Sequence, residues 1–213
     1  MKSLPRGRHG LSREFVVQNQ LDRLLDSIAE SLHEYGYDKT TVSVITSQAR
    51  VSKSDFYRHF TSKDQCFLAA YDDAVERLRR EVLGPCAKKD DWATAVVAAL
   101  EAVLGFLARN PARGDLLFVE GLRAGPDVYA RFQRVVHSFV CYLSDRAPQP
   151  AAGGAPGDCV AEAVVGGIAS LLSRWVLAGE TEEIEDRLAE ITEFALTPYL
   201  GSAEARRIAS RDA

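Results

Sequence analysis

The sequence has few of the residues that define several protein classes. Its 213 residues include one methionine and four cysteines, and only 8% of them are aromatic. A single methionine argues against a methionine-rich, promiscuous binding groove. Cys66, Cys86, Cys141 and Cys159 form no CxxC pair and have no histidine at a zinc-ligand spacing. We therefore expect reduced thiols in a cytoplasm, with no disulfide framework, no metal site and no cofactor.

Long apolar runs and catalytic signatures are also missing. No apolar run approaches the roughly 18 residues that a membrane span needs, and residues 11–20 are too polar for the apolar part of a secretory signal. Neither GxSxG nor HExxH occurs, and the four histidines are scattered. The hydrophobic fraction of 46% is sufficient for one medium domain or a small domain beside a larger one. The sequence therefore predicts a protein that is neither an enzyme nor a membrane protein.

The acidic net charge of −4 hides an uneven distribution. Up to Asp64 the chain has ten Lys and Arg residues against eight Asp and Glu, whereas the remainder has 16 against 22. The first segment is therefore +2 and the rest −6. The first thirteen residues carry four basic groups and no acidic one, in a stretch with Pro and Gly that predicts a flexible arm. This balance excludes a general polyanion binder but leaves room for a DNA-binding segment.

Apolar residues recur at helical spacing, and no segment has the alternating pattern of a strand. Stops are expected at Gly36, at Gly84-Pro85 and in a Pro/Gly/Ala loop over residues 148–157. The helices expected from this pattern cover about 12–35, 40 or 41–49, 52–60, 61–83, 96–107, 112–123, 128–143, 158–178 and 181–200, with a polar tail after them. The predicted fold class is all-α.

Two of these helices are short, joined by a tight turn and preceded by a longer helix, as is typical of a helix-turn-helix. In the second short helix Phe56 and Phe60 define the buried side, so Ser54, Asp55 and Arg58 point away from it. Small residues let a helix backbone approach DNA, and arginine reads a guanine edge or a phosphate. An ordinary solvated face remains the alternative. Asp55 alternatively serves as the acidic member of the capping box that begins this helix.

The strings Val51-Ser52-Lys53 and Phe56-Tyr-Arg-His-Phe60, with Ser-Lys63 after them, resemble the DNA-binding domain of TetR-family transcriptional regulators. The resemblance covers about residues 13–71. The chain departs from the family pattern in two places. Arg50 stands where the family usually has Gly, in a turn that can require positive φ, at a cost of about 1 kcal/mol for a residue with a side chain. Ser54-Asp55 replaces the common Gly followed by Thr or Ser, which suggests an unusual operator.

The resemblance implies a set of DNA contacts. Phosphate contacts are implied for Thr40 or Thr41 and for Ser52, Tyr57, His59 and Lys63, and contacts in the major groove for Lys53, Ser54, Asp55 and Arg58. Arg6 and Arg8 would reach the adjacent minor groove. A homodimer would hold two recognition helices about 34–36 Å apart on a near-palindrome.

The larger C-terminal part is rich in apolar helices, in which the family encloses an effector pocket and forms a dimer interface. The candidates for the pocket are Phe106, Phe118, Phe132, His137 and Trp175, and those for the dimer interface are Val164, Ile168, Leu172 and Ile191. Protomer core is the alternative for all of the apolar positions. The expected division is a basic arm over 1–12, a DNA-binding domain over 13–60, a ligand-binding and dimerisation domain over 61–201 and a polar tail over 202–213.

By resemblance, the chain is a bacterial, cytoplasmic repressor that binds operator DNA as a homodimer and is released by a small, largely apolar effector. Coupling between effector and DNA is expected to run through the long helix over residues 61–83. A binding or scaffold protein that kept the helix-turn-helix only for folding is the rival interpretation. It would lack salt-dependent DNA binding.

Overall fold

The structure, a computed structural model, describes residues 12–86, 89–121, 126–148 and 157–210, and every regular element in them is helical. The predicted all-α fold class is thus confirmed. The chain divides into two compact units, Met1–Ala74 and Val75–Ala213, and the long helix α4 spans the boundary.

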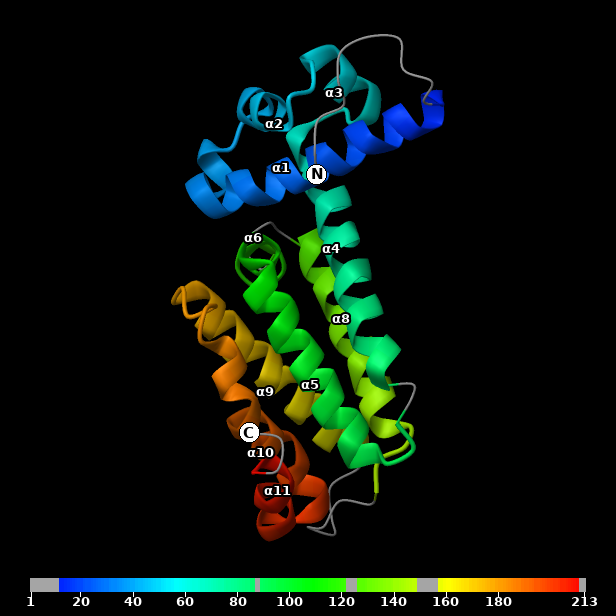
Figure 1. Cartoon of the computed structure of the whole chain (residues 1–213), viewed down its shortest axis with the longest axis vertical. Helices are drawn as coiled ribbons and strands as arrows, with labels where there is room; N and C mark the ends of the chain where they lie inside the picture. Colours follow the sequence, from blue (N-terminus) through cyan, green and yellow to red (C-terminus); the bar gives the residue numbers. More distant parts are fainter. Residues whose placement is uncertain (1–11, 87–88, 122–125, 149–156, 211–213) are drawn as a thin grey trace. The chain divides into compact units, whose positions relative to one another are not determined.

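The first unit consists of three complete helices and the first part of a fourth (Figure 1). It contains α1 (Arg13–Lys39), α2 (Val42–Ala49), α3 (Lys53–His59) and the first part of α4 (Lys63–Cys86). Large apolar side chains from all four helices are fully buried, which removes enough apolar surface from water to hold such short helices in place. These side chains are Leu24, Ile28, Ile45, Phe56, Phe67 and Tyr71.

Side-chain caps set the ends of these helices. The Thr41 hydroxyl accepts a hydrogen bond from the Val44 amide at 3.3 Å, and the Ser52 hydroxyl accepts one from the Asp55 amide at 3.0 Å. The predicted stop at Gly36 is confirmed as a kink with φ 74° and ψ 170°, although helical turns resume as far as Lys39. Each short helix therefore begins at a hydroxyl residue because its first amides need an acceptor.

The second unit is a bundle of helices (Figure 1). Its elements are α5 (Trp92–Arg109), α6 (Pro111–Asp115), the π-helix η1 (Leu116–Glu120), α8 (Pro126–Ser144), α9 (Gly157–Leu177), the 3₁₀ helix η2 (Ile184–Arg187), α10 (Leu188–Leu200) and α11 (Ser202–Ala209). Trp92 joins three of them: its indole N–H donates to the Leu143 carbonyl of α8 at 3.1 Å, and its ring lies 4.9 Å from that of Tyr199 on α10.

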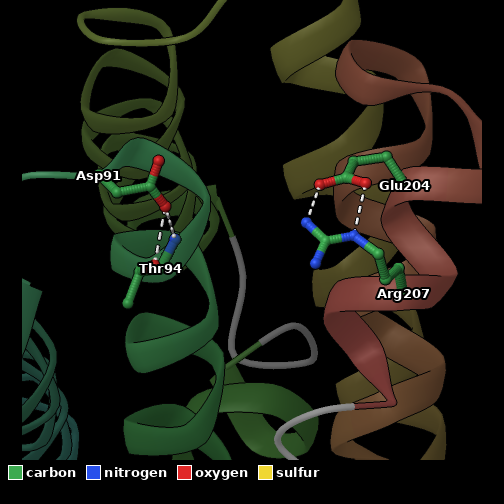
Figure 2. Close-up of polar contacts among 4 residues, drawn as sticks. All are labelled: Asp91, Thr94, Glu204 and Arg207. Atoms are coloured by element: carbon green, nitrogen blue, oxygen red, sulfur yellow. Dashed lines mark hydrogen bonds and ion pairs between the residues drawn. The ribbon is translucent and has the colours of Figure 1, made fainter.

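Polar contacts fix the helix ends of this unit (Figure 2). The Asp91 carboxylate accepts from the Thr94 amide at 2.8 Å and from its hydroxyl at 2.7 Å, which caps α5 and holds the pKa of Asp91 below its ordinary value. On α11 the Arg207 guanidinium pairs with Glu204 one turn earlier. Both contacts are local in sequence, so each stabilises its own helix.

Three expected boundaries were wrong. The break at Gly84-Pro85 does not end α4, which continues to Cys86 with Pro85 in its last turn, where little helix remains to be disrupted. The single helix expected over 181–200 begins as the 3₁₀ turn η2. Residues 202–209, expected as polar tail, form α11, whose buried side consists of Ala205 and Ala209 and therefore gave only a weak apolar signal.

Two helices correct the expectation of no membrane-length apolar segment. Trp92–Arg109 and Cys159–Leu177 are long and apolar enough to cross a membrane by length and composition alone. The first is mostly buried in its own unit, as the core helix of a bundle is. In the second only 28% of the apolar window is buried, which leaves part of α9 uncovered within the protomer.

Candidate nucleic-acid interface

Helix α3 has the two faces that the sequence predicted. Phe56 and Phe60 are buried, with 0% and 6% of their surface exposed. The opposite side is exposed, and it carries Lys53, Ser54, Tyr57 and Arg58. This side combines two cations, one small hydroxyl residue and one aromatic hydroxyl, which are groups that can bind phosphates and base edges.

Asp55 organises the start of α3 and restrains Arg58. One carboxylate oxygen accepts from the Ser52 hydroxyl at 2.7 Å, and the other accepts from the Arg58 guanidinium at 3.2 Å. Asp55 therefore acts in the cap, the alternative role that the sequence left open. Its ion pair with Arg58 is partly exposed, and such pairs are worth about 1 kcal/mol or less, so Arg58 can exchange this partner for another anion.

The two adjacent threonines before α2 have different environments. Thr41 is exposed and caps the helix, whereas Thr40 has 1% of its surface exposed. The Thr40 hydroxyl is a hydrogen-bond donor within reach of two carbonyl oxygens, that of Ser31 at 3.0 Å and that of Gly36 at 2.8 Å. The choice between the two threonines thus falls on Thr41, and Thr40 is removed from the candidate contacts because it is buried inside the unit.

Lys63 is half-buried against α1. Its ammonium group donates to the Tyr37 carbonyl at 2.8 Å and lies 3.8 Å from the centre of the Tyr37 ring. The Tyr37 hydroxyl in turn donates to Asp64, and burial together with this bond raises the pKa of Tyr37. Lys63 therefore holds the end of α1 against the start of α4, and any contact with DNA would be a second role.

The turn between α2 and α3 contains the feature that the departure from the family pattern predicted. Arg50 has φ 52° and ψ 45°, and it is the one non-glycine residue with positive φ among those that the structure describes. The Arg23 guanidinium of α1 donates to the Ala49 carbonyl at 3.0 Å and lies 3.5 Å from the Arg50 carbonyl oxygen. The turn is thus held from α1 by a side chain.

Other candidates are less clearly placed. His59 is half-buried at the end of α3, with its ring 6.2 Å from that of Phe60. Arg6 and Arg8 lie outside the described residues. Sequence reasoning missed Arg23 and Tyr37, which position the turn and Lys63. Their spacing from these partners, 26 or 27 residues, gave no local signal.

In the second unit, a groove of about 540 Å³ runs between α8 and α9. Two of the residues predicted for an effector pocket, Phe132 and His137, line this groove beside Tyr129, Glu162 and Ser170. Three other pocket candidates are packed in the protomer core and do not line this groove: Phe106, Phe118 and Trp175, with 1%, 8% and 2% of their surface exposed. Among the residues that the structure describes, no lysine or arginine lines the groove, and one carboxylate does.

The dimer candidates are also mostly core residues. Val164, Leu172 and Ile191 have 3%, 3% and 0% of their surface exposed within a single protomer, and Ile168 is half-buried. The three buried residues pack within their own protomer, as in the alternative that the sequence left open, because the wide apolar side of α9 lies on its own bundle. The opposite side of α9 is a stripe of mostly small residues, all exposed except the half-buried Gly167. This α9 stripe consists of Ala163, Gly166, Gly167, Ser170, Arg174 and Leu177.

The first unit, with a capped seven-residue helix exposing cations after a tight turn, defines the chain as a helix-turn-helix protein. Residues 24–70 match the family described as bacterial regulatory proteins, tetR family. An uncharacterized HTH-type transcriptional regulator of Mycobacterium bovis is 32% identical over 99 residues, which cover 40% of this chain and 47% of the relative. The match to this family lies within the first unit. The chain spans about half the length of the curated relatives that it matches.

Solved structures share the fold. A TetR-like transcriptional regulator from Rhodococcus sp. RHA1 is 22% identical with a TM-score of 0.61, over 85% of this chain and 95% of that one. FadR from Bacillus subtilis in complex with stearoyl-CoA is 14% identical with a TM-score of 0.72, over 84% and 98%. The fatty acid degradation regulator FadR from Bacillus halodurans is 13% identical with a TM-score of 0.71, over 83% and 93%.

Proposed function

We propose that this chain is a ligand-responsive transcriptional regulator that represses its target by binding a near-palindromic operator as a homodimer in the bacterial cytoplasm. The exposed side of α3 supports this proposal most directly, because its cations and hydroxyls stand opposite a buried phenylalanine pair. Residues 13–60 would be the DNA-binding domain and residues 61–201 the effector-binding and dimerisation domain. The repressing sign and the basic arm over 1–12 are proposed on the family resemblance.

On DNA, Arg58 and Ser54 would face base edges in the major groove, while Lys53 and Tyr57 would hold the backbone. Thr41 and Ser52 would offer hydroxyls to phosphates at the starts of the two short helices. His59, Lys63, Arg6 and Arg8 are secondary members of the proposed contact set. Asp55 would tune Arg58, because releasing their ion pair frees the guanidinium for a base or a phosphate.

A second copy of the chain would cover the α9 stripe, and it would lie at one edge of the α8–α9 groove because the stripe and the groove share Gly166 and Ser170. Leu177 is 63% exposed, and Phe194 of α10, which packs on Gly167, is 43% exposed. Small residues let two helices approach closely, so the stripe fits a helix-to-helix contact across a two-fold axis. This face replaces the buried candidates Val164, Leu172 and Ile191.

The α8–α9 groove would take an effector. Its lining of Phe132, Val136 and Val140 suits an apolar chain, and Tyr129, Gln133 and His137 could orient a polar end. FadR of Bacillus subtilis has been solved with stearoyl-CoA, which supports an effector with a long apolar part. Because no lysine or arginine of the described part of the chain lines the groove, a charged head group would stay in solvent.

The experiment that tests this proposal is a footprint of the purified protein on the DNA upstream of its own gene. We expect protection of one near-palindromic segment, weakened by acyl-CoA thioesters or other long-chain amphiphiles added in turn. The affinity for the operator should decrease as the salt concentration rises, because each phosphate contact releases counterions from the DNA. A chain that protects no segment and binds DNA without salt dependence would instead be the scaffold protein of the rival interpretation.

A further inference from the structure

The turn between α2 and α3 has hydrogen bonds that require a left-handed residue. The Arg50 amide donates to the Ser47 carbonyl at 3.2 Å, and the Val51 amide donates to the Thr46 carbonyl at 3.0 Å. This pair of bonds is the Schellman ending of a helix, in which the residue after the cap adopts positive φ and is usually glycine. A residue with a side chain is strained there, so an arginine at this position needs a reason.

A side chain from α1 fixes this turn. Arg23 is half-buried, and its guanidinium donates to the Ala49 carbonyl at 3.0 Å, at the negative end of α2. Burial and the nearby Arg50 charge lower the pKa of Arg23. Two cations therefore lie close together, one engaged with the carbonyls of the turn and the other at the surface.

The Arg50 side chain is exposed, and in the part of the chain that the structure describes its guanidinium has no hydrogen bond or ion pair. Repulsion from Arg23 disfavours bringing it back onto the protein. Ser52 and Lys53, at the start of the exposed side of α3, follow two and three residues later. An unpaired cation on a rigid turn, beside a second cation, is a site for an anion that comes from outside the protomer.

We propose that Arg50 binds a backbone phosphate of the operator next to the segment contacted through Ser52 and Lys53, and that Arg23 is the positioning residue that holds the turn for it. The inference rests on the proposed DNA-binding function. In this proposal the backbone strain at Arg50 is retained because it places a positive charge at a fixed position in the turn. A glycine would satisfy the turn but could not provide this charge.

The test compares Arg50→Asn and Arg50→Gly, which tolerate positive φ without charge, with Arg50→Lys, which keeps the charge. The probe is a duplex selected by the wild-type protein from a randomised pool, titrated between 50 and 200 mM salt. Loss of one phosphate contact lowers the slope of log K against log salt by about 0.9 per protomer. The ratio of wild-type to Arg50→Asn affinity should then shrink about 3.5-fold per protomer over this range. Arg50→Lys should keep the wild-type slope.

A charge that only stabilises the end of α2 would give a different result. The neutral variants would then melt at lower temperature and keep the wild-type salt slope, which would overturn the inference. Arg23→Gln tests the positioning role, because in that background the change from Arg50 to Asn should alter the slope less than in the wild type. Lys53→Ala distinguishes a failure of this inference from a failure of the proposed DNA-binding function. If Lys53→Ala lowers the slope of log K against log salt and Arg50→Asn leaves it unchanged, only the inference about Arg50 is refuted. Salt-independent binding by the wild type refutes the proposed function.

Discussion

At the scale of single residues, Arg58 is shared between the protein and its proposed ligand. It pairs with Asp55 at 3.2 Å while 60% of its side chain stays exposed. We expect Arg58→Ala to cost roughly 1–3 kcal/mol in operator binding and to relax the preference at one base position. Lys53→Ala is the matched control, since loss of a phosphate contact weakens all sequences about equally. Binding of both variants to selected and scrambled duplexes measures this, and equal losses on the two duplexes for Arg58→Ala would contradict a base contact.

Cys66 gives a prediction about pH. It is fully buried in the first unit, and burial raises the pKa of its thiol to about 12. Above the ordinary thiol pKa the unfolded chain releases this proton while the folded chain keeps it, so stability is intact at lower pH and falls from about pH 9 upward. In urea unfolding between pH 8 and 11, the free energy of unfolding of the wild type should decline as the pH rises. In Cys66→Ala this decline should be shallower, by up to about 1.4 kcal/mol per pH unit. The exposed Cys141, replaced by Ala, should leave the slope unchanged, and identical slopes in all three proteins would contradict the role of Cys66.

Sequence patterns identified several of these residues and could not separate others. The positive φ of Arg50 was predicted from its place in the turn, and the cap role of Asp55 from its distance to Ser52. Thr40 and Thr41 looked equivalent because each can cap a helix that starts one or two residues later. Only the packing of Thr40 against the carbonyls of Ser31 and Gly36 distinguishes them.

At the scale of elements, the short helix α3 depends on its cap. Seven residues are too few for a stable isolated helix, so the Ser52 hydroxyl, which accepts from the Asp55 amide and donates to the Asp55 carboxylate, matters more than it would in a long one. We expect Ser52→Ala to destabilise α3 by about 1 kcal/mol, which should raise amide hydrogen exchange in α3 about fivefold. Ser47→Ala on α2 is the control, because in the part of the chain described its hydroxyl makes no hydrogen bond. Equal exchange in both variants would rule out the cap.

Element ends were predictable where a local signal exists and not where tertiary packing sets them. Gly36 and Ser52 mark ends in the sequence because positive φ and amide capping are local requirements. α11 was missed because two buried alanines and an ion pair between Arg206 and Glu193 of α10, at 2.7 Å, hold it. Neither feature has the apolar periodicity by which helices are found.

At the scale of the whole molecule, α9 shows a limit of sequence patterns. They predict that an apolar helix face is buried, but not whether the same protomer or a second copy covers it. Val164 and Leu172 belong to an apolar side that had to be covered, and the protomer itself covers it. The α9 stripe carries little hydrophobic signal, yet it includes the part of α9 that stays exposed. The face that we propose for a partner is therefore the less apolar one, where small residues would permit close approach.

This reversal gives a prediction about assembly. Leu177 is 63% exposed in the protomer, so Leu177→Lys should leave the fold of one chain intact while placing a charge in the proposed contact between two copies. We expect a shift from dimer to monomer in light scattering after gel filtration, with loss of operator binding, because one recognition helix alone reads half a site. Tyr35→Lys is the matched control, since Tyr35 is 44% exposed on α1 and belongs neither to the α9 stripe nor to the α8–α9 groove, and it should remain dimeric. A Leu177→Lys protein that stays dimeric and binds the operator normally would mean that two copies meet through a different face.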